Sequence, residues 1–166
     1  MNKKGSLYLI PTELSTGAEK DTLPLVITKY ITKINVFIVE NIRTSRRYIK
    51  KLYPDKKIQD TIFYSYGKHH NINLENLLQH IINNEDIGLL SEAGLPCIAD
   101  PGSKIVEYAH NMNIKVIPIT GPSSIFLALM ASGMNGQNFT FNGYLPINKK
   151  LRSKKRKMYS LQFPLL

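Results

Sequence analysis

The sequence predicts an α/β fold in which helices flank an open, mainly parallel sheet. Two patterns predict this class. Short apolar runs that suit buried strands alternate along the chain with stretches whose apolar residues recur at helical spacing. The loops between them are rich in small residues and in Gly and Pro, which end regular elements. Such alternation is typical of a parallel sheet, because each strand needs a crossover before the next.

The central stretch over residues 87–102 (IGLLSEAGLPCIADPG) shows this pattern most fully. Its first four residues form an apolar run expected to be a strand buried on both faces. The small residues of Ser91–Gly94 let a ligand approach the backbone closely. Asp100 is expected to cap a helix, with Pro101 at its first position. This order predicts a ligand site at the carboxyl edge of the sheet, and a tight connection that binds nothing is the alternative.

The first half of the chain is expected to hold three strands and three helices. The strands are expected over 7–10, 36–39 and 61–66, and the helices over 23–34, 45–52 and 73–82. Thr44 or Ser45 is expected to cap the second helix, which Pro54 terminates. Asn71 or Asn73 is expected to cap the third helix.

The second half continues the alternation after the central strand. Helices are expected over 103–112 and from 121 to Gly133, and strands over 114–119 and 139–145. Beyond Pro146 the pattern gives way to a basic segment, and the final SLQFPLL predicts no regular element. The chain is therefore expected to stop early, as a truncated or frameshifted product would.

Composition excludes several classes of protein. With 43% hydrophobic residues, the 166-residue chain can form a real core. The single cysteine, Cys97, excludes an internal disulfide and a multi-cysteine zinc site and fits a reducing cytoplasm. No metal site is expected, because the four histidines lack ligand spacing: His69, His70, His80 and His110. The sequence shows no secretory signal and no apolar run long enough for a membrane span.

The net charge of +10 is concentrated in one segment. Seven basic residues lie between Lys149 and Lys157. The rest of the chain has 15 of the 22 basic residues and all 12 acidic residues, so it is only mildly basic. Lys149, Lys150 and Arg152 begin this segment, which predicts contact with a nucleic-acid backbone. A solvated, lysine-rich tail is the alternative.

The usual phosphate-binding and hydrolase motifs are absent. The sequence has no G-x-G-x-x-G, no Walker lysine loop and no G-x-S-x-G elbow. Instead, small-residue loops follow the expected strands at Pro11-Thr12, Glu40-Asn41, Ser91–Gly94 and Thr120–Ser124. Such loops offer backbone donors and acceptors, which suits a nucleoside-like ligand with a positive centre.

Five sequence blocks together carry a family resemblance. They are LYLIPT (7–12), ENIRTSRRYIK (40–50), SEAGLPCIADPG (91–102), GPSS (121–124) and FNGYLP (141–146). In this order the blocks resemble the tetrapyrrole methylase superfamily of S-adenosylmethionine-dependent methyltransferases, in particular the branch that methylates ribosomal RNA of the small subunit. The resemblance covers residues 7–146.

The resemblance implies a two-domain enzyme that binds S-adenosylmethionine in a cleft between its domains. Residues 1–140 would form the N-terminal domain, and residues 141–166 the start of a truncated C-terminal domain, so that most of the second domain is missing. The implied cofactor-binding residues are Pro11, Ser91, Glu92, Ala93, Gly94, Ile98, Ala99, Asp100, Ser123 and Ser124. Solvent exposure is the alternative for Glu92, and helix capping for Ser123. Glu40 and Arg43 are candidates for substrate handling, or else a capping acid and a surface base.

The implied function is methylation of ribosomal RNA at a ribose 2'-hydroxyl, in the cytoplasm, by a homodimer if the protein is full length. No residue is identified as the general base. One departure concerns the substrate, because ELSTGAEK (13–20) replaces the family's Gly-Asn-Leu-Gly-Asp stretch. The alternatives are methylation of a tetrapyrrole or another small molecule, and a non-catalytic remnant that binds RNA through its basic segment. A chain without the second domain is expected to bind the cofactor weakly and not to turn over.

Overall fold

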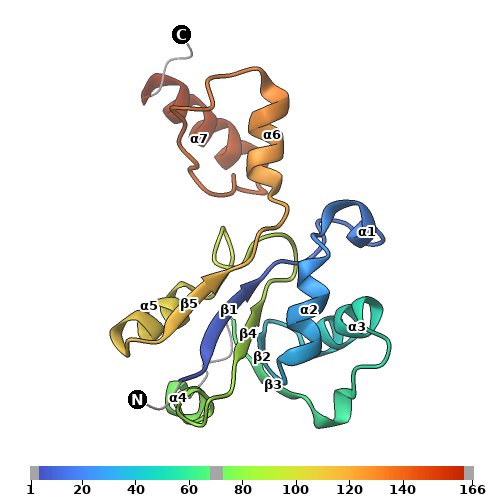
Figure 1. The fold of residues 1–166 in the computed structure, drawn as a ribbon. Helices are drawn as coiled ribbons and strands as arrows, with labels where there is room; N and C mark the ends of the chain where they lie inside the picture. The colour runs from blue at the N-terminus through green and yellow to red at the C-terminus, as the bar shows by residue number, and fades with distance from the viewer. Residues whose placement is uncertain (1–3, 68–72, 163–166) are drawn as a thin grey trace. The chain divides into compact units, whose positions relative to one another are not determined.

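The computed structural model describes residues 4–67 and 73–162, and it divides the chain into two compact units, Met1–Met134 and Asn135–Leu166. The first unit contains a five-stranded sheet with the order β3-β2-β4-β1-β5 (Figure 1). Its strands are β1 Ser6–Ile10, β2 Val36–Val39, β3 Ile62–Ser65, β4 Ile87–Leu90 and β5 Lys115–Pro118. All four strand pairings are parallel. The expected fold class, an open parallel α/β sheet with flanking helices, is confirmed.

Among the described residues, six α-helices belong to the first unit and one to the second. They are α1 Glu19–Thr22, α2 Val26–Lys33, α3 Ile42–Leu52, α4 Leu74–Ile82, α5 Ser103–Asn111 and α6 Ser124–Ser132, and then α7 Lys149–Gln162. A short 3-10 helix, Ile58–Asp60, precedes β3.

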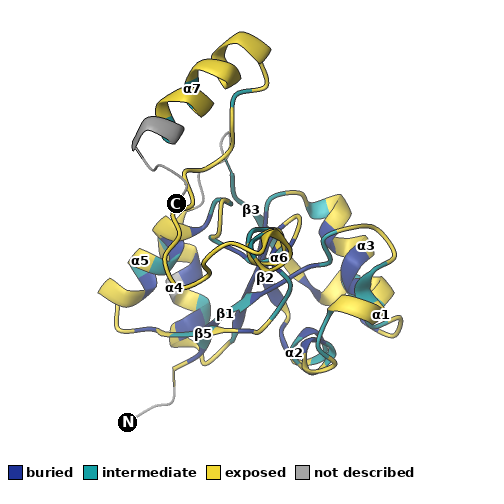
Figure 2. Ribbon diagram, turned by 90° about the horizontal axis from the view of Figure 1, so that it is seen from above, coloured by how far each residue is buried: buried dark blue, intermediate teal, exposed yellow. Residues whose placement is uncertain are grey.

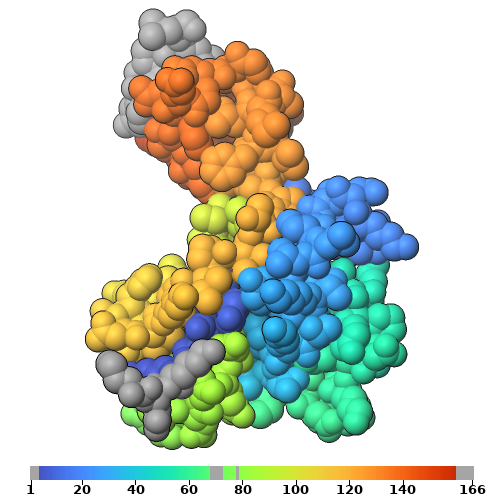
Figure 3. All heavy atoms as spheres, in the orientation of Figure 1, coloured from blue at the N-terminus to red at the C-terminus, as the bar shows by residue number. Residues whose placement is uncertain are grey.

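Two apolar clusters lie on opposite faces of the sheet. Residues of α4 and α5 pack on one face, for example Ile81 and Ile105 against Leu89. Residues of α2 and α3 pack on the other, for example Ile31 and Ile49 against Phe37, and these two helices lie side by side (Figures 1 and 3). β2 and β4 are buried along their whole length, because helices cover both faces.

Two of the predicted helix caps are wrong. The α3 helix is capped by Asn41, whose side-chain oxygen accepts hydrogen bonds from the amides of Arg43 (2.9 Å) and Thr44 (3.3 Å), so neither Thr44 nor Ser45 is the cap. The α5 helix begins at Ser103, after Gly102 with φ of +127°, so Asp100 does not cap it and Pro101 lies before it. By contrast, Asn73 caps α4 as expected, and Asn71 lies outside the described residues.

The second unit differs most from expectation. Residues 139–145 form no strand, and Gly143 takes a left-handed φ of +73° there. The basic segment forms α7, which begins where the Asn148 side chain accepts hydrogen bonds from the amides of Lys150 and Leu151. Lys, Arg, Leu and Met favour helix without any apolar stripe, which is why periodicity did not reveal α7.

Candidate functional site

The loops that follow β1, β4 and β5 meet at the carboxyl edge of the sheet. The amide of Thr12 donates to the carbonyl of Gly94 at 2.9 Å, and the Gly94 amide donates back at 3.2 Å. A Cβ atom at Gly121 would lie 2.3 Å from the Pro11 ring. A Cβ atom at Gly94 would lie 3.1 Å from the Pro122 carbonyl oxygen. The expected convergence of these three loops is therefore confirmed.

Buried hydroxyl groups fix the first two loops to each other. The Ser91 hydroxyl donates to the Gly94 carbonyl at 2.7 Å and lies 3.3 Å from the Thr12 hydroxyl. Both side chains are buried. The Ser91–Gly94 hydrogen bond therefore stabilises the turn after β4, and the contact with Thr12 holds this turn against the end of β1.

The loop from Ser91 to Gly102 contains unusual backbone angles. Gly94 and Gly102 have φ of +71° and +127°, and the non-glycine residues Cys97 and Ala99 have +67° and +59°. A left-handed conformation at a residue with a Cβ atom costs free energy, of order 1–3 kcal/mol in sparsely populated regions. Such strain gathers at binding sites, so these angles support a functional role for the loop.

Glu92 links this loop to α3. The Thr44 hydroxyl lies 2.9 and 3.0 Å from the two carboxylate oxygens of Glu92, and 3.0 Å from the carbonyl of Asn41. Thr44 lies in the first turn of α3, so the Glu92 carboxylate is placed near the positive end of the helix dipole. Glu92 is thus an exposed acid in a fixed position.

Asp100 is a second acid of the same loop. Burial raises its pKa above the usual value, and the nearby negative charge of Glu92 raises it further. Its Oδ2 atom is buried and has no hydrogen-bond partner among the described residues. Burial also raises the pKa of the Cys97 thiol, and Asp100 adds to that effect. A positively charged group placed beside these acids would stabilise the charged form of Asp100.

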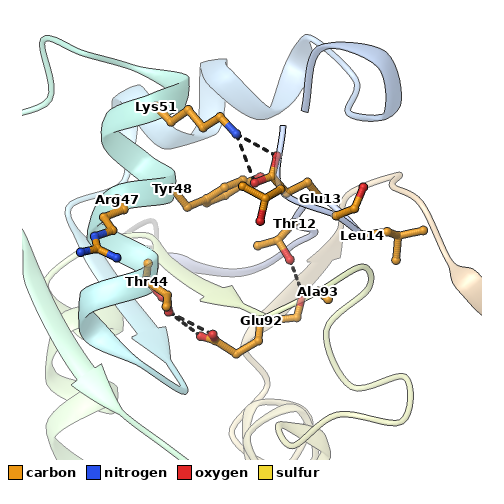
Figure 4. A pocket seen from close by; sticks show the side chains of 13 residues that line it. Thr12, Glu13, Leu14, Thr44, Arg47, Tyr48, Lys51, Glu92 and Ala93 are labelled. Atoms are coloured by element: carbon orange, nitrogen blue, oxygen red, sulfur yellow. Dashed lines mark hydrogen bonds and ion pairs between the residues drawn. The ribbon is translucent and has the colours of Figure 1, made fainter. Parts of the chain in front are cut away.

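A hollow of about 410 Å³ opens between the β1 loop, the β4 loop and α3 (Figure 4). Most of the residues that line it are of polar types, and Ser91, Glu92 and Ala93 form part of its wall. The remaining lining residues are Thr12, Glu13, Leu14, Ser15, Thr16, Thr44, Ser45, Arg47, Tyr48 and Lys51. This volume falls within the range of small-molecule sites.

Two side chains of α3 hold the β1 loop in place. The buried Tyr48 hydroxyl donates to the Pro11 carbonyl at 2.8 Å, and burial raises the pKa of Tyr48. The Lys51 ammonium lies 2.6 Å from Glu19 and 3.2 Å from Glu13 (Figure 4 shows the Lys51 side chain reaching across). Through its hydrogen bond, Lys51 lowers the pKa of Glu19 to about 2.

The structure brings together part of the predicted cofactor set. Pro11 and Gly94 are buried where the β1 and β4 loops meet, and Ile98 and Ala99 are exposed farther along the strained loop. Ser123 and Ser124 start α6 in the third loop. Ser123 is at the N-cap position, but its hydroxyl forms no capping hydrogen bond. The side-chain capping considered for Ser123 is therefore absent.

The predicted substrate residues fall in two places. Glu40 follows β2 and Arg43 lies in the first turn of α3, so both are near the part of α3 that lines the hollow. Lys149, Lys150 and Arg152 lie in α7, in the second unit.

Sequence reasoning missed the α3 wall itself. Thr44, Arg47, Tyr48 and Lys51 line the hollow together. Their spacing of three and four residues was the available signal, because it places side chains on one face of a helix.

Among the residues that the structure describes, no group of three or more His, Cys, Asp or Glu residues could hold a metal ion. His80 instead contacts the Tyr64 hydroxyl at 2.8 Å and pairs with Glu85. His110 is exposed in α5, and His69 and His70 lie outside the described residues. In the described ranges, no helix has the length and apolar character that a membrane span requires.

Comparison with known proteins points to one kind of protein, although no family model matches the chain. The chain is 30% identical over 152 residues to ribosomal RNA small subunit methyltransferase I of Buchnera aphidicola from Schizaphis graminum, which covers 92% of this chain and 51% of that protein. It is 32% identical over 150 residues to the protein of that name from Halalkalibacterium halodurans, covering 90% and 49%. For the Bacillus subtilis protein, identity is 31% over 159 residues, covering 95% and 51%.

The chain therefore spans about half the length of the curated relatives it matches. The similarity extends over nearly all of this chain, which agrees with the range of the five sequence blocks. Over about nine-tenths of its residues, the chain is thus a relative of ribosomal RNA small subunit methyltransferase I, in the tetrapyrrole methylase family that its motifs resemble.

Proposed function

We propose that this protein works in S-adenosylmethionine-dependent methylation of ribosomal RNA, at a ribose 2'-hydroxyl. One observation carries the proposal: the loops after β1, β4 and β5, which hold the family-like blocks, meet at one edge of the sheet. Ligands of open α/β sheets bind at this edge. The names of the relatives, which are ribosomal RNA methyltransferases, support the same chemistry.

The residues at this edge fit the proposed cofactor. Gly94 presents backbone without a side chain, and a Cβ atom there would crowd Leu14 at 3.0 Å. The Oδ2 atom of Asp100 lacks a partner among the described residues, and Glu92 adds a second negative charge. Acids and carbonyl groups suit a ligand with a positive centre better than an anionic one. Pro11, Ser91, Ala93, Ile98, Ala99, Ser123 and Ser124 complete the proposed set.

When bound, S-adenosylmethionine supplies a methyl group on a positively charged sulfur. The work of this chain is then positioning, because correct orientation of two reactants accounts for much of a rate enhancement. Ser91 and Thr12 fix the loop that approaches the ligand, and Thr44 fixes the Glu92 carboxylate. Glu92 and Asp100 favour the positive ligand by charge.

An RNA acceptor fits this chain better than a tetrapyrrole. The α7 helix contains seven basic residues and no acidic one, and Lys149, Lys150, Lys154 and Lys157 lie together on one side of it. The phosphodiester backbone of a nucleic acid binds such surfaces through release of counterions. Lys149, Lys150 and Arg152 are proposed as phosphate contacts.

The test of the cofactor site uses Glu92→Gln with Glu107→Gln as a matched control on α5. Calorimetric titration at millimolar S-adenosylmethionine should show saturable binding. We expect Glu92→Gln to weaken it about tenfold, as loss of one charged contact of roughly 1.4 kcal/mol would. The control should bind as the unmodified chain does. Equal binding by all three proteins, or no binding at all, would overturn the proposed site.

The acceptor is tested separately, by transfer of a tritiated methyl group to small ribosomal subunits that lack the modification. Label at one ribose would support the proposed reaction and would contradict the expectation that a chain without the second domain does not turn over. Cofactor binding without label in RNA would show that this chain does not catalyse transfer to this acceptor. Label in a tetrapyrrole would show that the acceptor is a tetrapyrrole and not RNA.

We also propose that the chain self-associates. This agrees with the homodimer that the family resemblance implies for a full-length protein. Phe126, Leu127 and Met130 of α6 are each about half exposed or more, at 49, 49 and 77%. Exposed apolar surface of this kind favours association. Light scattering over a concentration series checks it, and a constant monomer mass would contradict it.

A further inference from the structure

The α3 helix is a second basic surface, separate from α7. It contains five basic residues and no acidic one in eleven positions: Arg43, Arg46, Arg47, Lys50 and Lys51. The net charge of the first unit does not reveal this surface, because acidic residues elsewhere in that unit offset the positive charges of α3. Its charge lies beside the hollow described above, since Arg47 and Lys51 belong to the wall.

Three of the five basic side chains have partners. Lys51 is paired with Glu13 and Glu19. The Lys50 ammonium donates to the Pro54 carbonyl at 2.6 Å. The Arg46 guanidinium lies over the Phe63 ring, 5.2 Å from its centre.

The other two, Arg43 and Arg47, have no side-chain hydrogen bond, ion pair or ring contact with any described residue. Both are exposed. They are four residues apart, so they lie on the same face of the helix about 6 Å apart along its axis. The charge available to a ligand on α3 is therefore concentrated at these two arginines.

The helix that carries them is held firmly. Asn41 caps it, and Ser45, Tyr48 and Ile49 are buried beneath it. Tyr48 also bonds to the Pro11 carbonyl. The two guanidinium groups thus project from a fixed backbone, next to a hollow of about 410 Å³ that is lined by hydroxyl groups.

We propose that Arg43 and Arg47 bind phosphodiester groups of an RNA strand and thereby position one nucleotide at the hollow. The inference rests on the proposed function for the identity of the polyanion. Guanidinium groups bind phosphate oxygens in pairs, and the helix N-terminus adds to their positive potential. Thr44, the residue after Arg43, and Glu92, which accepts a hydrogen bond from the Thr44 hydroxyl, both line the hollow and would lie beside that nucleotide. Arg43 and Arg47 are positioning residues here.

An RNA strand fits this surface better than an acidic peptide does. The two arginines lie beside the hollow, whose wall contains the carboxylates of Glu13 and Glu92. A carboxylate-rich partner would meet these acids at close range, whereas a nucleotide presents a neutral sugar and base beyond its phosphate. The hydroxyl groups of the wall suit a ribose.

The experiment compares Arg43→Gln/Arg47→Gln with Lys104→Gln/Lys115→Gln. The control pair removes the same charge from exposed positions on α5 and β5. Fluorescence anisotropy with a labelled single-stranded oligonucleotide from small-subunit ribosomal RNA gives affinity from 25 to 200 mM salt. We expect the arginine variant to lose at least about tenfold in affinity at low salt. Its log–log salt slope should fall by about 1.4, since each single-strand phosphate contact contributes about 0.7. The control should keep the slope.

Two further arms complete the test. Arg43→Lys/Arg47→Lys should restore most of the salt slope, because the charge returns, and its circular dichroism should match that of the unmodified chain. Polyglutamate should compete less well than RNA at equal charge. Equal slopes for the arginine and control variants, or equal competition by polyglutamate, would overturn the proposal.

The outcome is distinguishable from failure of the proposed function. If methyl transfer and cofactor binding fail while the arginine variant still loses the salt slope, the RNA surface stands and the enzyme proposal falls. If cofactor binding holds and the slope does not change, the RNA surface falls alone.

Discussion

Two helices of this protein are strongly basic, and they differ in almost everything else. The α3 helix packs Ser45, Tyr48 and Ile49 into the first unit, while α7 has no buried side chain among its described residues. Figure 2 shows α7 as almost wholly exposed. The sequence shows the α7 charges as a dense cluster, whereas those of α3 are mixed with core residues. The basic cluster that is conspicuous in the sequence, α7, is therefore the one that packs less against the rest of the protein.

The difference has a consequence for recognition. Charges on a packed helix occupy fixed positions and are suited to placing one nucleotide, because orientation demands rigidity. Charges on a helix without a buried face supply attraction that depends little on sequence or geometry. We therefore interpret α3 as the positioning surface and α7 as the attracting one.

The largest expected effect tests the packing itself. Ile49→Ala removes a fully buried side chain from α3, and we expect it to cost about 2–5 kcal/mol of unfolding free energy, because it leaves a cavity. The matched change in α7 is Leu151→Ala, at a side chain that is 57% exposed, and should cost less than about 0.5 kcal/mol. Urea unfolding measures both. Similar costs at the two sites would remove the contrast between the helices.

The next effect concerns attraction by α7. Replacing Lys149, Lys150 and Arg152 by Gln should lower RNA affinity about tenfold or more at low salt. The loss should be similar for unrelated RNA sequences, because phosphate contacts carry no sequence information. Filter binding over a salt series checks this. A loss confined to one RNA sequence would show that α7 reads sequence, and unchanged affinity would show that it makes no contact.

Helix capping offers a matched pair with a smaller effect. Asn41 and Asn148 accept the same kind of hydrogen bonds at the starts of α3 and α7. Asn41→Ala should cost about 1 kcal/mol of stability, because packing couples α3 to the core. Asn148→Ala should instead reduce the helical circular dichroism signal with little change in the urea midpoint. A midpoint shift of equal size in both variants would contradict this expectation.

The smallest effect is a pH dependence of the contact between Glu19 of α1 and Lys51 of α3. Lys51 lowers the pKa of Glu19 to about 2 from the ordinary 4.5, so this contact stabilises the fold above pH 4.5 and is lost as pH falls through about 2. In Lys51→Met, the Glu19 titration midpoint followed by NMR should rise toward 4.5. An unchanged midpoint would show that Lys51 is not the cause. Lys150→Met in α7 serves as the control.

The sheet was predictable because its strands are short apolar runs with turn residues on both sides. Val36–Val39 and Ile87–Leu90 are buried on both faces, so hydrophobicity alone marks them. The meeting of the Pro11, Ser91 and Thr120 loops followed from parallel topology. These parts of the fold depend on patterns that are local in sequence.

The parts that were missed depend on contacts between distant residues or on the absence of a pattern. The pairing of Lys51 with Glu13 and Glu19 requires α3 and the β1 loop to be adjacent, which spacing does not show. Asp100 resembles a helix cap in sequence, but Gly102, with a φ of +127°, takes the N-cap position, so the helix begins two residues later than expected. The α7 helix lacks an apolar stripe, so only intrinsic propensity favoured it.

The strand order also determines when the sheet can assemble during synthesis. β1 lies between β4 and β5, with Leu7 beside Ile87 on one side and Val116 on the other. By contrast, β2 and β3 pair through Val36 and Ile62, which are much closer in the chain. The β2–β3 pair can therefore form early on the ribosome, while β1, the first strand made, waits for most of the first unit to emerge. Until then the apolar residues of β1 lack their partners in the sheet, so we expect slow translation through residues 11–86 to lengthen their exposure to misfolding.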